Sequence, residues 1–328
     1  MRNSSSAPEQ SEMPRSCVQT ASDVYQLGRR YTLSGAKSAS LRQAAFGDPA
    51  RQAQQPEAER RGLRDRRQEA GEGYMMQPVK KRRTIYVVLP AYNEGKMIGK
   101  LISEISEAMD EFGFRYRIII VDDGSTDNTR QVIEEIGEVN NVLYYLHEKN
   151  QGLGATIRDG LMYASGITED RDIIITMDAD DTHLPGSILQ MVRMIYEGYD
   201  MVIASRYKPG ARVVGLSWYR KVLSYGASLI VQVLFPISGV KDYTCGYRAY
   251  RADIIKQAFD KYGDKFVSES GFQCMIDILL KLRANNTIIG EIPFVLRYDY
   301  KVGKSKLPVF KTVADTLKLL FRRRFCHD

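Results

Sequence analysis

Short apolar runs alternate with longer amphipathic stretches along the chain from Thr84 onward. The apolar runs occupy 85–90, 116–125, 141–146, 172–180 and 200–207. Between them, apolar residues recur at helical spacing, for example over 97–111 and 128–136. Strands that alternate with helices in this way predict an α/β fold, a doubly wound and mostly parallel sheet with helices on both faces.

The first 80 residues lack this pattern. They are rich in Arg, Gln, Ala, Ser and Glu and cannot bury enough apolar surface to offset chain entropy, so we expect a disordered tail over 1–80. This segment also lacks the apolar core of a signal peptide, and export is not predicted. The folded domain is expected over 81–307, and a basic amphipathic helix over 308–328.

The net charge of +7 is concentrated at the ends of the chain. Residues 1–83 hold 16 Lys and Arg against 9 Asp and Glu, whereas 84–328 hold 31 of each, and 297–328 alone hold 9 basic against 3 acidic residues. Nothing resembles a nucleic-acid-binding module, so the basic ends favour a membrane surface as partner over nucleic acid. Four widely spaced cysteines without a CxxC pair indicate neither zinc nor disulfides and fit a cytosolic location.

Polar motifs follow four of the predicted strands. In a parallel α/β sheet the ligand crevice lies at the carboxyl ends of the strands, where this chain places PAYNE (90–94), DDGSTD (122–127), DADD (178–181) and SRY (205–207). No glycine-rich phosphate loop of the GxGxxG or GxxxxGK[ST] type follows any strand, which argues against dinucleotide and P-loop proteins.

Asp178, Asp180 and Asp181 crowd three carboxylates directly behind a buried strand. A divalent cation explains this charge, because Mg²⁺ and Mn²⁺ prefer oxygen ligands and Mg²⁺ is usually held by one or two carboxylates plus substrate phosphates. The alternative is that Asp180 or Asp181 caps the next helix while Asp178 bonds a loop. His183, which follows the motif, is interpreted as a polar loop residue.

The earlier strand ends suggest a place for a nucleoside. Pro90 and Tyr92 would wall a base, Glu94 could bond sugar hydroxyls, and Asp122 or Asp123 could accept from a base or a ribose hydroxyl. Ordinary turns and helix caps explain the same residues equally well.

The motifs together resemble glycosyltransferase family 2, which has the GT-A fold, and within it the dolichyl- and polyprenyl-phosphate mannose synthases. The resemblance covers about residues 84–307. It is carried, in family order, by LPAYNE, VDDGSTD, GLGATIRDG, MDADDTH, ASRYKPG, RKVLSYGAS, DYTCGYRAYR and GKSKL.

The resemblance implies a set of site residues. Nucleotide-sugar binding is implied for Pro90, Tyr92, Glu94, Val121, Asp123, Asp178, Ala179, Asp180, Arg206, Arg297 and Lys301. Metal binding is implied for Asp178, Asp180 and Thr182, where Thr182 replaces the family's Gln or Ser. Asp180, Arg206 and Arg220 are the expected catalytic residues, with the arginines on the phosphates of donor and acceptor. Arg297 and Lys301 are alternatives for one basic position.

The implied reaction is metal-dependent, inverting transfer of a hexose, with GDP-mannose favoured, to a polyprenyl phosphate. A phosphate monoester is already largely dianionic near neutral pH and needs no general base. One alternative uses a UDP-glucose-type donor and a hydroxyl acceptor, with Asp242, Glu269 or Asp277 as the base. Another is a non-catalytic nucleotide-sugar binder.

A polyprenyl acceptor requires contact with a bilayer. No stretch of the chain approaches the roughly 20 apolar residues of a spanning helix. The segments 222–235 and 309–325 could each lie in the membrane interface or pack on the domain. We therefore expect a peripheral protein at the cytoplasmic face of a membrane.

Overall fold

The computed structural model describes residues 83–137, 141–300, 315–316 and 318–323. The predicted tail over 1–80, Lys301 and most of the predicted helix over 308–328 lie outside the described residues. The same holds for the side chain of Arg220, although its backbone is described.

A seven-stranded sheet forms the centre of the described domain, in the order β3-β2-β1-β4-β7-β5-β8. Its strands are β1 (Thr84–Ala91), β2 (Arg115–Asp122), β3 (Val142–Leu146), β4 (Ile173–Thr176), β5 (Met201–Ser205), β7 (Arg248–Arg251) and β8 (Ile289–Pro293). The five strands predicted from apolar runs are β1 to β5, each within a few residues of its expected bounds. Buried apolar side chains such as Val87, Ile119 and Ile174 make these strands the core.

All neighbouring strands are parallel except at β7, which runs antiparallel to both β4 and β5. Because β7 is reversed, the segment 242–247 enters it from the edge where β4 and β5 end. Thr176, the last residue of β4, is the register partner of Arg248, the first residue of β7. The reversal therefore adds a further segment to the edge that carries the strand-end motifs.

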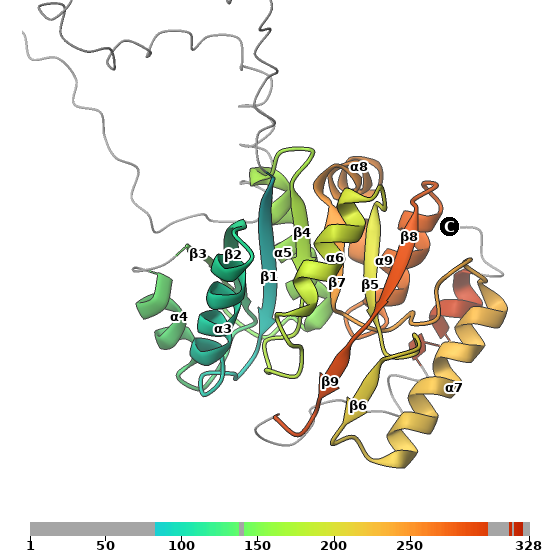
Figure 1. Cartoon of the computed structure of the whole chain (residues 1–328), viewed down its shortest axis with the longest axis horizontal. Coiled ribbons are helices and arrows are strands. Elements are labelled where there is room, and N and C mark those ends of the chain that lie inside the picture. The colour runs from blue at the N-terminus through green and yellow to red at the C-terminus, as the bar shows by residue number, and fades with distance from the viewer. Residues whose placement is uncertain (1–82, 138–140, 301–314, 317, 324–328) are drawn as a thin grey trace, which may run out of the picture. The chain divides into compact units, whose positions relative to one another are not determined.

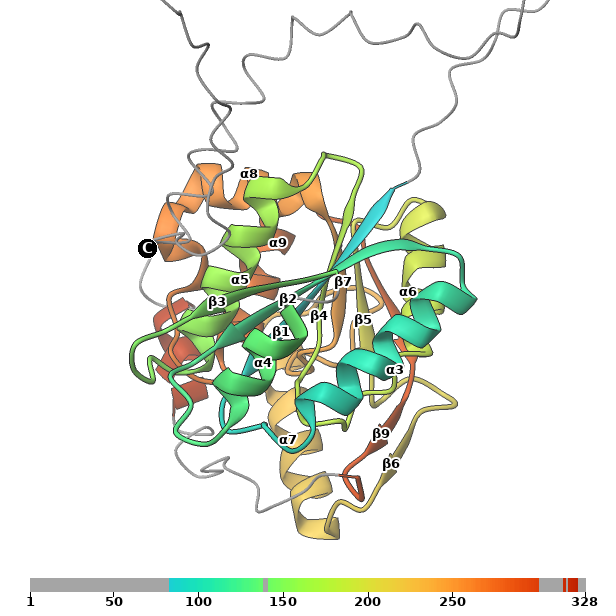
Figure 2. The same ribbon diagram turned by 90° about the vertical axis from the view of Figure 1, so that its left-hand side faces the viewer.

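Helices cover both faces of the sheet, and the predicted α/β fold class is confirmed (Figures 1 and 2). One face is covered by α3 (Ile98–Glu111), α4 (Thr129–Gly137) and α6 (Ser187–Tyr196). The other is covered by α5 (Leu153–Ile167), α8 (Ala252–Tyr262) and α9 (Cys274–Arg283), with the short 3₁₀ helix η2 (Gly263–Val267) between the last two. Strands buried on both faces need continuous apolar runs, which is what the sequence contains.

A smaller unit stands beside the carboxyl edge of the sheet. It holds the parallel pair β6 (Arg212–Val214) and β9 (Val295–Arg297), and the helix α7 (Trp218–Leu234), which stands away from the central sheet (Figure 1). Among the described helices, none combines the length and the apolar character needed to cross a bilayer.

Candidate active site

The loops after β1 and β2 lock together at the carboxyl edge of the sheet. Pro90 is the register partner of Val121, so the two predicted nucleotide contacts are neighbours. Beyond them, the Asn93 side-chain oxygen accepts the Thr126 N–H at 2.7 Å, and the Asn93 N–H donates to the Ser125 hydroxyl at 2.8 Å. These bonds join the two motifs into one wall of the site.

Tyr92 and Glu94 flank Asn93 in that wall, and both side chains are partly exposed. Asn93 itself has a φ of 54°, in the left-handed region that asparagine tolerates better than most residues. The turn lets both neighbours reach the surface, where a base and a sugar would have to bind.

Asp123 holds the loop that precedes α5. Its carboxylate accepts the backbone N–H groups of Gln151 at 2.8 Å and Gly152 at 2.9 Å. Gly152 has a φ of 91°, which a residue with a Cβ rarely adopts. The acid predicted to bind the nucleotide thus also fixes the neighbouring glycine loop.

His147 is a site residue that the sequence interpretation missed. Its ring lies between Asp123, 2.8 Å from Nδ1, and Asp159, 3.1 Å from Nε2, and its side chain is 1% exposed. Burial would lower the pKa of His147, but the two carboxylates raise it from 6.5 to about 9. Arg158 also donates to Asp159 at 2.8 Å. His147 directly follows β3, so inspecting every strand end would have found it.

The carboxylates of the DADD motif differ in their exposure to solvent. Asp178 and Asp180 are partly exposed, with Ala179 buried between them. The Thr182 hydroxyl and N–H both donate to Asp180 Oδ1, at 2.6 and 3.2 Å. The described residues contain no group of three or more His, Cys, Asp or Glu arranged to hold a metal. Two accessible carboxylates fit Mg²⁺ or Mn²⁺ when substrate phosphates complete the coordination.

Asp181 differs from Asp178 and Asp180 because it is buried and pairs with a lysine of the helix layer. Its φ of 60° turns the chain, and its Oδ2 accepts a 2.6 Å bond from Lys100 Nζ on α3. Lys100 also pairs with Glu104 at 3.1 Å. The third acid of the motif therefore ties the loop to the helix layer.

His183 is packed behind the DADD motif. Its Nδ1 accepts the Asp178 N–H at 3.1 Å, its ring stacks on Tyr247 at 5.0 Å, and Phe294 meets it edge-on at 5.6 Å. The interpretation of His183 as a polar loop residue did not predict this packing. The ring supports the backbone that carries Asp178.

Arg206 and Asp242 form a buried ion pair at the end of β5. Arg206 donates through Nε and Nη2 to the two carboxylate oxygens, each at 2.7 Å, and Nη2 also reaches the Thr244 hydroxyl. Burial alone would raise the pKa of Asp242, but the Arg206 charge and hydrogen bonds lower it below its ordinary value. This geometry fixes the orientation of a guanidinium predicted to hold phosphate.

The segment 242–246 links this pair to the DADD motif. The Gly246 carbonyl accepts a 2.7 Å bond from the Thr176 hydroxyl at the end of β4. A Cβ at Gly246 would lie 3.3 Å from Asp178 Oδ1, so a larger residue would press on that carboxylate. The strand ends of β4 and β5 are therefore bridged by one segment.

Glu269 and Asp277, the other acids considered as a base, are paired with cations. Asp277 is buried against Lys281 at 2.7 Å and also binds Arg323. Glu269 binds Arg322. Leu319 and Leu320 beside these arginines are buried, so the described part of the C-terminal segment packs on the domain.

The backbone of Arg297 lies beside the loop that carries the DADD motif. Its N–H donates to the Thr182 carbonyl at 3.0 Å. Its guanidinium is bound to Asp299 at 2.8–3.2 Å and lies over the Tyr300 ring at 3.9 Å. Arg220 is placed only by its backbone, in the first turn of α7.

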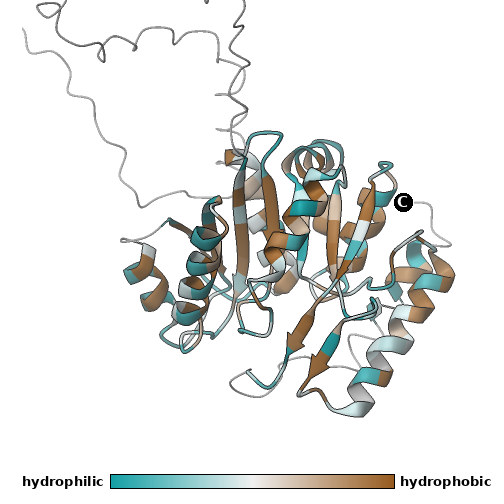
Figure 3. Ribbon diagram, in the orientation of Figure 1, coloured by the Kyte–Doolittle hydropathy of each residue, from teal (hydrophilic) through white to brown (hydrophobic). Residues whose placement is uncertain are grey.

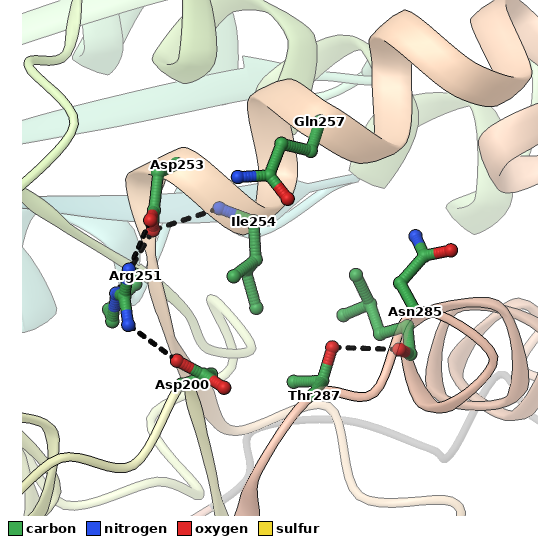
Figure 4. Close-up of a pocket in the computed structure, with 8 residues that line it drawn as sticks. Asp200, Arg251, Asp253, Ile254, Gln257, Asn285 and Thr287 are labelled. Atoms are coloured by element: carbon green, nitrogen blue, oxygen red, sulfur yellow. Dashed lines mark hydrogen bonds and ion pairs between the residues drawn. The ribbon is translucent and has the colours of Figure 1, made fainter.

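The polar pocket in Figure 4 lies at the opposite edge of the sheet. Its lining residues lie before β5 and β8, at the end of β7 or in α8, and Arg251 pairs there with Asp200 at 2.6 Å and with Asp253. These ion pairs already satisfy its charged groups, and the pocket contains none of the predicted site residues.

Comparison with known protein families shows which family the chain belongs to. Residues 86–259, more than half of it, match the model of Glycosyl transferase family 2. The chain belongs to glycosyl transferase family 2. Two similar proteins are a dolichol-phosphate mannosyltransferase of Pyrococcus furiosus, 30% identical over 73% of this chain, and a polyprenol monophosphomannose synthase of Mycolicibacterium smegmatis, 29% identical over 73%. The aligned parts span 63% and 86% of those proteins.

Solved structures agree on the fold. A mycobacterial protein has a TM-score of 0.56 with 20% identity, covering 75% of this chain and 76% of its own. Glucosyl-3-phosphoglycerate synthase of Mycobacterium tuberculosis, solved with Mn²⁺, uridine diphosphate and glucosyl-3-phosphoglycerate, has a TM-score of 0.55 with 19% identity, covering 78% and 88%. These likenesses support the fold class predicted from the sequence.

Proposed function

We propose that this protein is a metal-dependent, inverting glycosyltransferase that moves a hexose from a nucleotide donor to a polyprenyl phosphate. The observation that carries the proposal is the pair of accessible carboxylates, Asp178 and Asp180, bridged by the segment 242–246 to Arg206. A cation site beside an oriented guanidinium suits a diphosphate leaving group.

The proposed site contains side chains that would bind the substrates or the metal and side chains that orient these groups. Asp178 and Asp180 would hold Mg²⁺ or Mn²⁺, and Thr182 fixes the Asp180 carboxylate through two hydrogen bonds. When bound, the metal supplies Lewis-acid stabilisation of the departing diphosphate. Arg206 is held by Asp242 and Thr244 before any substrate arrives, so its guanidinium needs little reorganisation to meet a phosphate.

The acceptor is assigned as a phosphate because no general base is then required. A phosphate monoester has a second pKa of about 6 and attacks as the dianion, inverting the anomeric centre by in-line displacement. The competing hydroxyl acceptor would need Asp242, Glu269 or Asp277 as base, and each of these binds a cation. The names of the two similar mannosyltransferases support a polyprenyl phosphate.

The donor is proposed as GDP-mannose, with a UDP-glucose-type donor as the alternative. Pro90 and Tyr92 would wall the base and Glu94 would bond sugar hydroxyls, with Val121 and Asp123 in the neighbouring strand end beside them. Mannose is favoured by the names of those relatives alone. A peripheral position at the cytoplasmic face of a membrane stays a prediction.

A donor panel tests the proposal. Purified protein is incubated with radiolabelled GDP-mannose or UDP-glucose, a polyprenyl phosphate and Mg²⁺ or Mn²⁺, and label in the lipid phase is counted. We expect GDP-mannose to be used, a chelator to stop transfer, and Asp180→Ala to lower it by about 100-fold or more. NMR of the product sugar gives its anomeric configuration.

Asp170→Ala is the matched control, since this carboxylate is 79% exposed and lies outside the site. Asp180→Ala that transfers as well as Asp170→Ala would refute the proposed role of the metal motif. Calorimetric binding of nucleotide sugar without any transferred label would favour a non-catalytic binder instead.

A further inference from the structure

His147 is a buried histidine at the end of β3 to which the proposed function gives no role. Its ring lies between two carboxylates, with Nδ1 2.8 Å from Asp123 and Nε2 3.1 Å from Asp159. A neutral imidazole carries one N–H and could donate to only one of them, whereas an imidazolium donates to both. The geometry therefore fits the charged ring, in agreement with the pKa of His147, which is raised to about 9.

The charges around His147 balance one another. Arg158 donates to the other oxygen of Asp159 at 2.8 Å, so two cations face two carboxylates. Burial alone would raise the pKa of Asp159, but hydrogen bonds from His147 and Arg158 lower it below its ordinary value. Tyr145 on β3 meets the His147 ring edge-on at 5.5 Å. The central strands are mostly hydrophobic (Figure 3), so charges buried beside them are stable only when they are paired.

The bond from His147 is one of three that orient the Asp123 carboxylate. Oδ1 accepts from His147 Nδ1 and from the Gln151 N–H, and Oδ2 accepts from the Gly152 N–H. A carboxylate offers about four acceptor positions, so these contacts leave one on Oδ2 for a donor of the nucleotide base. The direction of that position depends on the donors that hold the carboxylate.

The three donors differ in what anchors them. The two backbone donors belong to the loop that Asp123 itself fixes, whereas His147 belongs to a strand end. Its own N–H donates to the Asp122 carbonyl at 2.9 Å and continues the pairing of β2 with β3. The Asp122 carboxylate is turned to the Ser125 N–H at 3.2 Å, away from this cluster. His147 therefore ties Asp123 to the sheet rather than to the loop.

The ring also keeps two acids apart. Without a cation between them, Asp123 and Asp159 would face each other as like charges in a buried site. Such a pair favours either rotation of one carboxylate or uptake of a proton. Either change would remove the acceptor that Asp123 offers to a base.

We infer that His147 is a positioning residue for the nucleotide, because its Nδ1–H holds the Asp123 carboxylate in the orientation that accepts a hydrogen bond from the base. The inference rests on the proposed function, in which Asp123 lies beside the base. His147 acts through Asp123 and not on the reacting sugar, so it governs donor affinity rather than the chemical step. When the ring loses its proton, one of the two carboxylates loses its donor, and the affinity for nucleotide falls.

Calorimetric titration of the full chain with GDP and with UDP, each with Mg²⁺, tests the inference through two variants of one residue. Asparagine places its amide nitrogen near the position of Nδ1, and glutamine places it near that of Nε2. His147→Asn therefore keeps a donor for Asp123, and His147→Gln keeps one for Asp159 instead. For the nucleotide that wild type prefers, we expect His147→Gln to weaken binding by about tenfold or more and His147→Asn by less than about threefold. In the transfer assay the loss should appear in KM for the donor, with kcat within about twofold of wild type.

Arg251→Gln is the matched control. Arg251 is likewise a cation between two carboxylates, Asp200 and Asp253, but it lies at the opposite edge of the sheet. This variant should bind nucleotide as wild type does. Circular dichroism of each variant confirms that it is folded before affinities are compared.

A pH series with Asp159→Asn separates the Nδ1 bond from a purely structural role. An asparagine there can accept from Arg158 through its oxygen and donate to Nε2 through its nitrogen, which keeps the proton of a neutral His147 ring on Nδ1. The ratio of Asp159→Asn affinity to wild-type affinity should be near one at neutral pH and rise by about threefold or more as pH passes about 9. Taking this ratio at each pH cancels titration of the nucleotide itself. The series also decides the inference if His147→Gln does not fold.

The inference is overturned if His147→Gln binds nucleotide as tightly as Arg251→Gln, or if His147→Asn and His147→Gln lose affinity equally. It is also overturned if the affinity ratio for Asp159→Asn stays constant with pH, or if the loss in His147→Gln falls on kcat at an unchanged KM. If wild type binds neither GDP nor UDP, the proposed function fails and the inference fails with it. If wild type binds and transfers while His147→Gln does so equally well, the inference alone fails.

Discussion

The helices α3 and α7 have similar amphipathic patterns but opposite surroundings. On α3 the apolar positions Ile98, Leu101, Ile105 and Met109 are fully buried. On α7 the apolar residues Val222, Tyr225 and Val233 are more than half exposed. The apolar side chains of α3 face the core, whereas α7 leaves several of its apolar side chains at the surface. Periodicity shows that a helix has an apolar face, but not what covers it.

The largest effect on stability is expected in the β5–α7 region, from Asp242→Ala. The substitution leaves Arg206 largely buried without its carboxylate, and removing one partner of a buried pair costs about 3–5 kcal/mol. Urea denaturation gives the free energy of unfolding. Asp170→Ala, at an exposed pair, should cost less than about 1 kcal/mol. Equal losses of unfolding free energy for the two variants would show that the Arg206–Asp242 pair stabilises the fold no more than an exposed ion pair does.

The second largest loss of stability is expected from Leu101→Ala on α3. This side chain is fully buried, and truncating a buried leucine costs about 2–5 kcal/mol through lost burial and a cavity. The same denaturation experiment measures it. A loss below about 1 kcal/mol would show that α3 is not packed as tightly as its burial indicates.

His147, which follows β3, is expected to make the free energy of unfolding depend on pH. Its folded pKa of about 9 exceeds the ordinary value of 6.5, so its protonated form stabilises the fold. This contribution, on the order of 3 kcal/mol, is complete below pH 6.5 and is lost as pH rises through about 9. The difference in unfolding free energy between wild type and His147→Gln should therefore shrink between pH 6.5 and pH 9. A constant difference across that window would contradict the bridge to Asp123 and Asp159.

The smallest effect on stability is expected from Val222→Ala on α7. The side chain is 62% exposed, and an exposed substitution of this kind changes the free energy of unfolding by no more than about 0.5 kcal/mol. Set beside Leu101→Ala in one denaturation series, it measures the contrast between the two helices directly. A loss of unfolding free energy near that of Leu101→Ala would show that another part of the chain covers Val222.

Much of the fold was predictable because the first five strands are continuous apolar runs, which are largely buried in β1, β4 and β5 and half-buried in the edge strand β3. The strands β7 and β8 were not predicted, although both pair in the same sheet. In β7, RAYR contains two arginines, and Arg248 is buried by donating to the carbonyls of Tyr243, Cys245 and Met275. Two of these carbonyls lie only three and five residues before Arg248, but Met275 belongs to the distant helix α9, and no apolar run marks β7 as a buried strand.

The candidate site was predictable to a similar degree. The strand-end rule pointed to Asp123, Asp178, Asp180 and Arg206, and the structure places them along one edge of the sheet. The same rule, applied to β3, would have led to His147. The roles of Asp181 and Asp242 were open in the sequence, since each depends on a cation from a distant element, Lys100 on α3 and Arg206 after β5.

The sequence by itself determined the alternation of strand and helix, the edge of the sheet that carries the chemistry, and the oxygen-rich character of the candidate metal site. These follow from side-chain periodicity and from the geometry of parallel strands, both of which are local. The tertiary structure decided which charges are neutralised inside the protein and which apolar faces remain exposed. Those outcomes depend on pairs of residues far apart in the chain, because burial and ion pairing are set by what packs against a group.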